Sequence, residues 1–265
     1  MNRRPQLLLS AVVLASALAG CGNAASPGAS AGGSSGSPTS GLKGTVTVLA
    51  AASLKESFSA LGRQFEAAHP GTTVVFSFGP SSGLAQQITA GAPADVFASA
   101  SPKDMATVTS AGDAGSPTTF AKNVLEVAVP PANPAKITSL ADLTRSGVKV
   151  AVCQAQVPCG VVAAKVFAAA KMKVTPVTQE VDVKSVLTKV QLGEVDAGLV
   201  YSTDVKAAGT KVRGVVIPPD VNASTSYPIA ALKGAPNPAA ATAFVAYLLS
   251  AAGRSALTAA GFASP

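Results

Sequence analysis

The chain has 265 residues, of which 48% are hydrophobic and 12% charged, and its formal net charge is +7. A chain of this size and hydrophobicity can bury one or two compact cores. Its lysines are scattered along the sequence, which argues against a nucleic-acid-binding protein because such proteins concentrate basic residues in a patch or a motif.

The first residues have the pattern of an export signal. Arg3 and Arg4 precede an apolar run from Leu7 to Ala19, and small residues lead up to Cys21. The run is about 13 residues long, whereas a helix needs roughly 20 to span a bilayer. A cleaved signal peptide over residues 1–20 is therefore favoured over a retained membrane anchor. Removal of Arg3 and Arg4 leaves the mature chain with a net charge of +5.

Residues 21–42 are predicted to form a lipid-anchored flexible linker. The motif Leu18-Ala19-Gly20-Cys21 resembles the bacterial lipobox, which implies that Cys21 is lipidated and becomes the first residue of the mature protein. From Gly22 to Gly41 the residues are small or polar and uncharged, so nothing drives their burial. We expect a protein that is exported and anchored to the outer face of the cell membrane.

Strands alternate with helices in the first part of the body. Leu54, Phe58, Leu61 and Phe65 recur at helical spacing on one face, which predicts a helix that ends near His69. The other elements expected here are strands at 45–50, 73–78 and 94–99, a turn at 79–83, and helices at 84–90 and from 101 onward.

The same alternation continues to the C-terminus. We expect strands at 124–129, 148–152, 175–180, 197–201 and 212–217, a loop at 153–160, helices at 161–172, 183–192, 203–208, 238–249 and 251–260, and an extended segment at 226–232. This order predicts an α/β fold of two lobes, each a mainly parallel sheet flanked by helices. Ligands of such sheets bind at the carboxyl ends of the strands, where loops lead into helices.

Four segments resemble the signature blocks of molybdate-binding periplasmic proteins. They are Ala50-Ala-Ala-Ser-Leu54, Phe78-Gly-Pro-Ser-Ser-Gly-Leu-Ala-Gln-Gln-Ile88, Gly91-Ala-Pro-Ala-Asp-Val-Phe-Ala-Ser-Ala100 and Gly198-Leu-Val-Tyr-Ser202. The resemblance implies a type II periplasmic-binding-protein fold, with lobe 1 at 43–125 and 229–265 and lobe 2 at 126–228. It also implies capture of molybdate and delivery to the permease subunits of an ABC importer.

The resemblance further implies a set of ligand contacts. They are Ser53 and Ser81 through hydroxyl and backbone N–H groups, Cys159 and Val183 through backbone N–H groups, and Tyr201 through its hydroxyl. Pro80 departs from a turn that is usually rich in serine, so Ser82 is a possible additional contact. The predicted order of strands and helices agrees independently. Each of Ser53, Ser81, Cys159 and Val183 falls at a turn that leads into a predicted helix, and the N-terminus of a helix attracts anions. Lys55 and Lys184 are expected to be solvated.

These contacts form a site with hydrogen-bond donors only. Molybdate is fully deprotonated near neutral pH and offers acceptor oxygens alone, whereas phosphate usually keeps a proton and favours a carboxylate acceptor, which no matched position supplies. Tungstate, nearly the same size as molybdate, is expected to bind as well. A binding protein of the same fold for sulfate or another small anion stays the alternative, because the sequence does not show the size of the cavity. No cofactor and no cation site are expected beside the oxyanion.

Cys153 and Cys159 lie six positions apart in an exported chain, where disulfides persist. A disulfide is therefore favoured over two reduced thiols, although the spacing alone does not ensure the Cα separation that a bridge needs.

An enzyme is the main alternative class of protein. The chain has one histidine, His69, and it has neither a Gly-x-Ser-x-Gly motif nor the lysine of a phosphate-binding loop after Gly83. We expect a monomeric binding protein without catalytic residues.

Overall fold

The structure is a computed structural model that describes residues 41–265. The predicted signal peptide, the predicted lipidation site Cys21 and almost all of the predicted linker lie outside the described residues.

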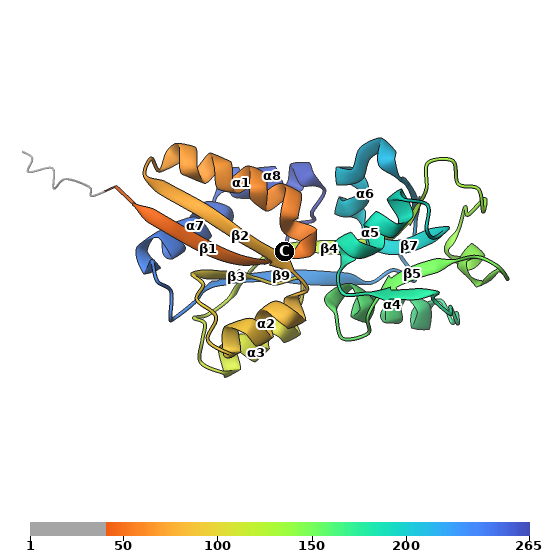
Figure 1. Cartoon of the computed structure of the whole chain (residues 1–265), viewed down its shortest axis with the longest axis horizontal. Helices are drawn as coiled ribbons and strands as arrows, with labels where there is room; N and C mark the ends of the chain where they lie inside the picture. Colours follow the sequence, from red (N-terminus) through yellow and green to blue (C-terminus); the bar gives the residue numbers. More distant parts are fainter. Residues whose placement is uncertain (1–40) are drawn as a thin grey trace, which may run out of the picture. The chain divides into compact units, whose positions relative to one another are not determined.

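The described residues form one sheet of nine strands in the order β2-β1-β3-β9-β4-β7-β5-β6, with β8 paired to β4 (Figure 1). The strands are β1 (Gly44–Ala51), β2 (Thr72–Gly79), β3 (Val96–Ala98), β4 (Thr118–Val129), β5 (Val150–Cys153), β6 (Thr178–Glu180), β7 (Ala197–Tyr201), β8 (Arg213–Val216) and β9 (Ser224–Ala231).

The sheet is mixed, with parallel pairs toward both ends and antiparallel pairs in the middle. β1 is parallel to β2 and β3, and β5 is parallel to β6 and β7. β9 runs antiparallel to β3 and β4, and β4 runs antiparallel to β7 and β8. The α/β class is as predicted, but the middle of the sheet is not parallel, because β4 and β9 carry the chain out of one half and back again.

Helices cover the sheet. They are α1 (Lys55–Ala68), α2 (Ser81–Thr89), α3 (Pro102–Ser110), α4 (Pro158–Ala169), α5 (Val183–Gln191), α6 (Ser202–Ala208), α7 (Pro238–Leu249) and α8 (Ala251–Ala260), with 3-10 turns η1 (Ala52–Leu54), η2 (Leu140–Thr144) and η3 (Gly209–Lys211). No single helix in residues 41–265 is long and apolar enough to cross a membrane, although α7 and α8 pass that test as a pair bent by 61°.

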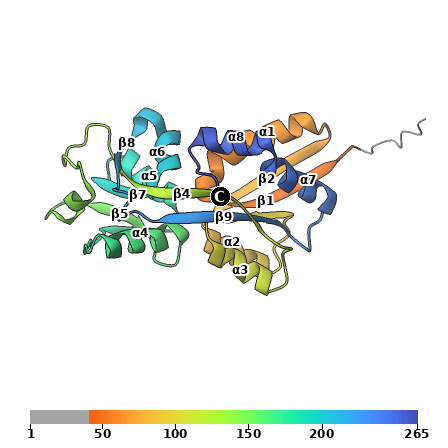
Figure 2. The ribbon, with the colours of Figure 1, turned by 180° about the vertical axis from the view of Figure 1, so that it is seen from behind.

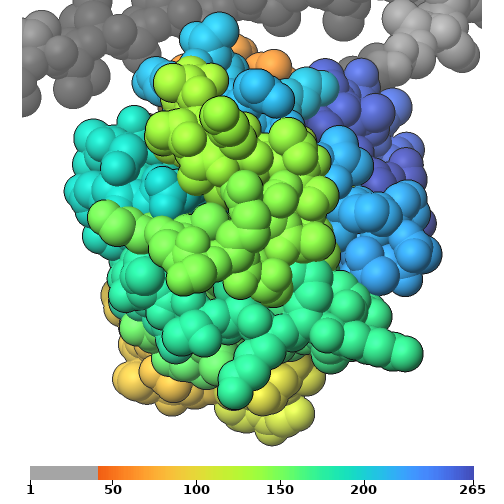
Figure 3. Space-filling view, turned by 90° about the vertical axis from the view of Figure 1, so that its right-hand side faces the viewer, coloured from red at the N-terminus to blue at the C-terminus, as the bar shows by residue number. Residues whose placement is uncertain are grey.

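The buried residues separate into cores on either side of the molecule's middle. One side holds the core of Phe58, Phe65 and Phe244 and a smaller core under α2 and α3, and the other holds the core around Val127, Val162 and Leu199. We call the first side lobe 1 (β1–β3, α1–α3, α7, α8) and the second lobe 2 (β5–β8, α4–α6). β4 and β9 run between them (Figure 2). The boundaries between the lobes that the sequence predicts, at 125/126 and 228/229, fall inside β4 and β9. When the molecule is viewed from the end of lobe 2, residues from the middle of the sequence form most of the visible surface (Figure 3).

Two helices begin earlier than the sequence predicts. α2 begins at Ser81 rather than at 84, directly after Pro80, and α4 begins at Pro158 rather than at 161. Pro158 is the first residue of α4, where proline is suitable because its fixed φ matches the helix and its missing N–H would be unpaired there anyway. Pro80 precedes α2 as an extended residue with ψ of 129°. Ser81 and Cys159 therefore lie inside the first turn of a helix and not in the preceding loop.

Candidate functional site

A small pocket lies where helix starts from both lobes meet, and all five residues of the predicted contact set line it. Lobe 1 contributes Ser53 and Ser81, and lobe 2 contributes Cys159, Val183 and Tyr201. Ser82, the possible additional contact, is not among the lining residues. The described lining includes no lysine or arginine, so hydrogen-bond donors and helix dipoles supply its positive potential.

Three of the helix starts at the pocket, those of η1, α2 and α4, have no side-chain cap, whereas α5 is capped by Asp182. The residues before η1, α2 and α4, which are Ala51, Pro80 and Val157, provide no side-chain cap. By contrast, side chains of Ser101, Asn237 and Ser250 cap α3, α7 and α8, which do not contribute to the pocket. The first N–H groups of a helix have no partner within it. The uncapped starts therefore present backbone donors to the pocket, which is an arrangement that binds anions.

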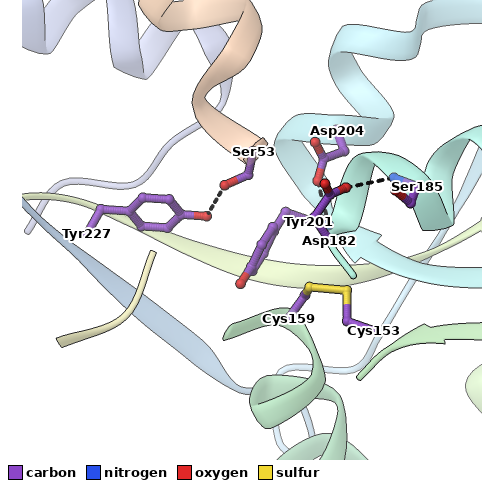
Figure 4. Close-up of a disulfide and its surroundings, with 8 residues drawn as sticks. All are labelled: Ser53, Cys153, Cys159, Asp182, Ser185, Tyr201, Asp204 and Tyr227. Atoms are coloured by element: carbon purple, nitrogen blue, oxygen red, sulfur yellow. Dashed lines mark hydrogen bonds between the residues drawn. A yellow bond between two sulfur atoms is a disulfide. The ribbon is translucent and has the colours of Figure 1, made fainter. Parts of the chain in front are cut away.

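The two serine hydroxyls are each held by a hydrogen bond to a neighbouring residue. Ser81 Oγ accepts the N–H of Ala100 at 2.9 Å, so its proton is available to the pocket. Ser53 Oγ lies 2.9 Å from the hydroxyl of Tyr227, and either group can donate (Figure 4). If Tyr227 donates, the Ser53 proton is also available. Both serines are buried.

Tyr201 is the last residue of β7 and is buried. Its hydroxyl has no hydrogen-bond partner among residues 41–265. Burial, with smaller contributions from Tyr227 and Asp204, raises the pKa of Tyr201 well above its usual value, so the hydroxyl keeps its proton. A buried donor without a partner in a pocket is suited to an acceptor that arrives with a ligand.

Cys153 and Cys159 are joined by a disulfide between the end of β5 and the first turn of α4. The bridge lies beside Tyr201 in Figure 4. The following residue, Gly160, approaches the backbone of Gln154 so closely that a Cβ at position 160 would overlap its carbonyl group. The loop that presents the Cys159 N–H is thus held by a covalent bond and by close packing.

Lys184 is not solvated, contrary to the expectation from its place near a helix start. Its Nζ lies 2.7 Å from Asp204 Oδ1 and 2.7 Å from Glu56 Oε2, and only 19% of its side chain is exposed. Burial raises the pKa of Asp204 to about 6, against the lowering effect of Lys184. Asp204 Oδ2 also accepts the N–H of Tyr201 at 3.0 Å.

Asp182 lines the pocket and was missed by the sequence argument, which found no carboxylate at the site. Its Oδ1 accepts the N–H of Ser185 at 2.8 Å and so caps α5 (Figure 4). The signal was present in the sequence, since aspartate directly before a predicted helix is a preferred capping residue. The lack of an acceptor is therefore no longer an argument against phosphate.

The described residues contain no group of three or more His, Cys, Asp or Glu side chains that could hold a metal ion. The lining of the pocket offers hydrogen-bond donors beside the single carboxylate of Asp182.

Comparison with known proteins adds independent findings. Residues 46–263 match the family described as bacterial extracellular solute-binding protein. The chain is 45% identical over 259 residues to the molybdate-binding protein ModA of Mycobacterium tuberculosis, a match that covers 97% of both chains.

Solved structures share the fold. The periplasmic molybdate-binding protein of Azotobacter vinelandii has a TM-score of 0.74 at 23% identity, and the match covers 83% of this chain and 99% of that one. The sulfate-binding protein SubI of Mycobacterium tuberculosis has a TM-score of 0.71 at 21% identity, with 82% and 86% covered. The fold by itself therefore does not distinguish between these two oxyanions.

Proposed function

The chain belongs to the bacterial extracellular solute-binding proteins, and we propose that it captures molybdate outside the cytoplasm and delivers it to an ABC importer. The observation that carries this proposal is the meeting of uncapped helix starts and protonated hydroxyls in one pocket without a cationic side chain. The 45% identity to a molybdate-binding protein supports the choice of ligand.

The proposed contacts combine side-chain and backbone donors. Ser53 and Ser81 donate to the oxyanion through their hydroxyl and backbone N–H groups, Cys159 and Val183 through their backbone N–H groups, and Tyr201 through its hydroxyl. Ser82 stays a secondary candidate, because it lies in the first turn of α2 without lining the pocket. The helix dipoles add positive potential without a counter-ion. No cofactor is needed, since the oxyanion itself is the cargo.

Binding is proposed to close the two lobes around the ligand. The contacts come from both lobes, so a bound oxyanion links them, and β4 and β9 are the strands about which they would move. A closed form differs in surface from an open one, and membrane permease subunits would recognise that difference. The protein acts in this scheme as a monomer without nucleic acid.

A panel of oxyanions tests the ligand. Thermal shifts are measured with molybdate, tungstate, sulfate and phosphate at equal concentration. A ligand present at 100 times its Kd stabilises the folded state by about 2.7 kcal/mol, which a shift in Tm readily reports. We expect large shifts with molybdate and tungstate and small ones with sulfate and phosphate. A sulfate shift equal to that with molybdate would favour the alternative function, a binding protein for sulfate or another small anion.

The location of the protein is a separate proposal. The signal pattern and the lipobox-like motif support export and attachment to the outer face of the membrane through Cys21. Labelling with a fatty-acid probe tests the anchor. Label should be incorporated by the native chain and be absent from Cys21→Ala, and equal labelling of the two would contradict the proposal.

A further inference from the structure

We propose that Glu56 and Lys184 form a latch between the two lobes, beside the pocket, that slows ligand release. The inference rests on the proposed function, since it concerns how the two lobes hold an oxyanion between them. Lys184 is a positioning residue in this scheme and does not touch the ligand, because it is absent from the lining of the pocket.

The latch joins helices from different lobes. Glu56 lies in the first turn of α1 in lobe 1, and Lys184 lies in the first turn of α5 in lobe 2. Their 2.7 Å contact connects positions that are 128 residues apart in the chain. The remaining ion pairs in residues 41–265 lie within lobe 2, between Arg145 and Asp142, between Lys184 and Asp204, and from Lys189 to Glu180 and Glu194. The Glu56 pair is thus the one described ion pair that breaks when the lobes separate.

Both ends of the latch are anchored at the pocket. Lys184 directly follows Val183, which lines the pocket, and Glu56 lies three positions after Ser53, which also lines it. Lys184 is held from behind by Asp204, which is fully buried and also fixes the backbone N–H of Tyr201. The ammonium group is therefore already in position, and closure brings Glu56 to it with little loss of side-chain freedom on the Lys184 side.

Charge alone predicts the opposite effect on binding. Glu56 is negative and lies close to a pocket that is proposed to hold a dianion, so removal of its charge should strengthen binding by simple electrostatics. A latch predicts weaker binding on the same change. The sign of the effect therefore decides between the two.

The test compares Glu56→Gln with Glu194→Gln in the exported chain, with molybdate as the probe. The two glutamates are matched, because each side chain is 50% exposed and each pairs with a lysine, Glu56 at 2.7 Å and Glu194 at 2.9 Å. The Glu194 pair lies within lobe 2. Stopped-flow displacement by tungstate gives the dissociation rate constant, and calorimetry gives Kd.

We expect Glu56→Gln to raise the dissociation rate constant about two- to fivefold, the range of one partly exposed ion pair. Glu194→Gln should leave it unchanged. Added salt should reduce the difference between Glu56→Gln and the native chain, because salt screens the pair. Glu56→Asp keeps the charge but shortens the side chain by one methylene, so it should also speed release.

Equal dissociation rate constants for Glu56→Gln, Glu194→Gln and the native chain would overturn the latch, as would tighter binding by Glu56→Gln. A native chain that binds none of the four oxyanions would refute the proposed function instead. In that case the latch is tested by small-angle scattering of the ligand-free variants. The latch requires a larger radius of gyration for Glu56→Gln than for Glu194→Gln. Equal values would overturn it.

Discussion

Two buried tyrosines at the pocket differ in how their hydroxyls are used. Tyr227 pairs with Ser53 at 2.9 Å, whereas Tyr201 has no partner among the described residues. A buried polar group without a partner costs roughly 1–3 kcal/mol of stability. A bound oxyanion would supply an acceptor for the Tyr201 hydroxyl and remove this cost. Stability and ligand affinity should therefore respond to a change at this residue in different directions.

Tyr201→Phe is expected to weaken molybdate binding at least about tenfold, because a hydrogen bond to a charged ligand contributes roughly 1.5–3 kcal/mol. The ligand-free protein should be as stable as the native chain or slightly more stable, since the unpaired hydroxyl is gone. Calorimetry and urea unfolding measure the two quantities. Unchanged affinity would remove Tyr201 from the contact set.

Lys184→Met is expected to lower the free energy of unfolding by about 3 kcal/mol at pH 8, because Asp204 is left buried without its partner. Burial raises the pKa of Asp204, and loss of Lys184 raises it further. A raised carboxyl pKa means that stability is retained at low pH and lost as the pH rises through that pKa. The defect should therefore be smaller at pH 5 than at pH 8, as urea unfolding would measure. Adding Asp204→Asn should restore most of the loss, and a pH-independent defect would contradict this account.

At the scale of elements, the starts of helices divide by role. The side chain of Asn237 caps α7, whereas α2 follows Pro80 and α4 begins with Pro158, and neither proline caps its helix, so both helices leave their first N–H donors to the pocket. A donor contributes most to binding when its loop is already ordered before the ligand arrives. The disulfide of Cys153 and Cys159 supplies this order at α4.

Cys153→Ser/Cys159→Ser tests that role. The entropy of closing so short a loop corresponds to about 2 kcal/mol of stability, and we expect a comparable loss in urea unfolding. Molybdate affinity should fall several-fold, because binding must then order the loop that presents the Cys159 N–H. Both proteins are compared in a Cys21→Ser background, so that no free thiol remains outside the pair. Equal affinities would show that the bridge serves stability alone.

At the scale of the whole molecule, the pocket is assembled from two bodies with separate cores. β4 belongs to both, because its residues 118–124 pair with β9 and its residues 125–129 pair with β7 and β8. Because both strands run without a break from one lobe to the other, a relative motion of the lobes would take the form of bending at this crossing. Contacts between the lobes, such as that of Glu56 with Lys184, would resist such an opening.

Molybdate is therefore expected to lower the radius of gyration of the exported chain in small-angle scattering, as the lobes close. Sulfate at the same concentration is the matched control and should produce a smaller change. A radius of gyration that is unaffected by a saturating amount of molybdate would contradict closure while leaving binding itself intact.

Much of the fold was predictable from the sequence because it depends on local pattern. The apolar spacing of Leu54, Phe58, Leu61 and Phe65 predicted α1, and all four are fully buried. The alternation of strands and helices predicted the α/β class, and the family resemblance selected five residues that the structure brings to one pocket. Helix starts were less well predicted, because a proline at or just before the first turn is compatible with both a loop and a helix.

The tertiary structure alone decided which groups near the pocket are paired. Lys184 was expected to be solvated because its local sequence shows only a charged residue near a helix start, whereas its partners Glu56 and Asp204 come from two other helices. Three other features also depend on how distant segments pack. They are the antiparallel middle of the sheet, the carboxylate of Asp182 in the pocket wall and the unpaired hydroxyl of Tyr201. Periodicity and capping preferences act over a few residues, but hydrogen bonds and ion pairs depend on distances between segments that only the packed lobes bring together.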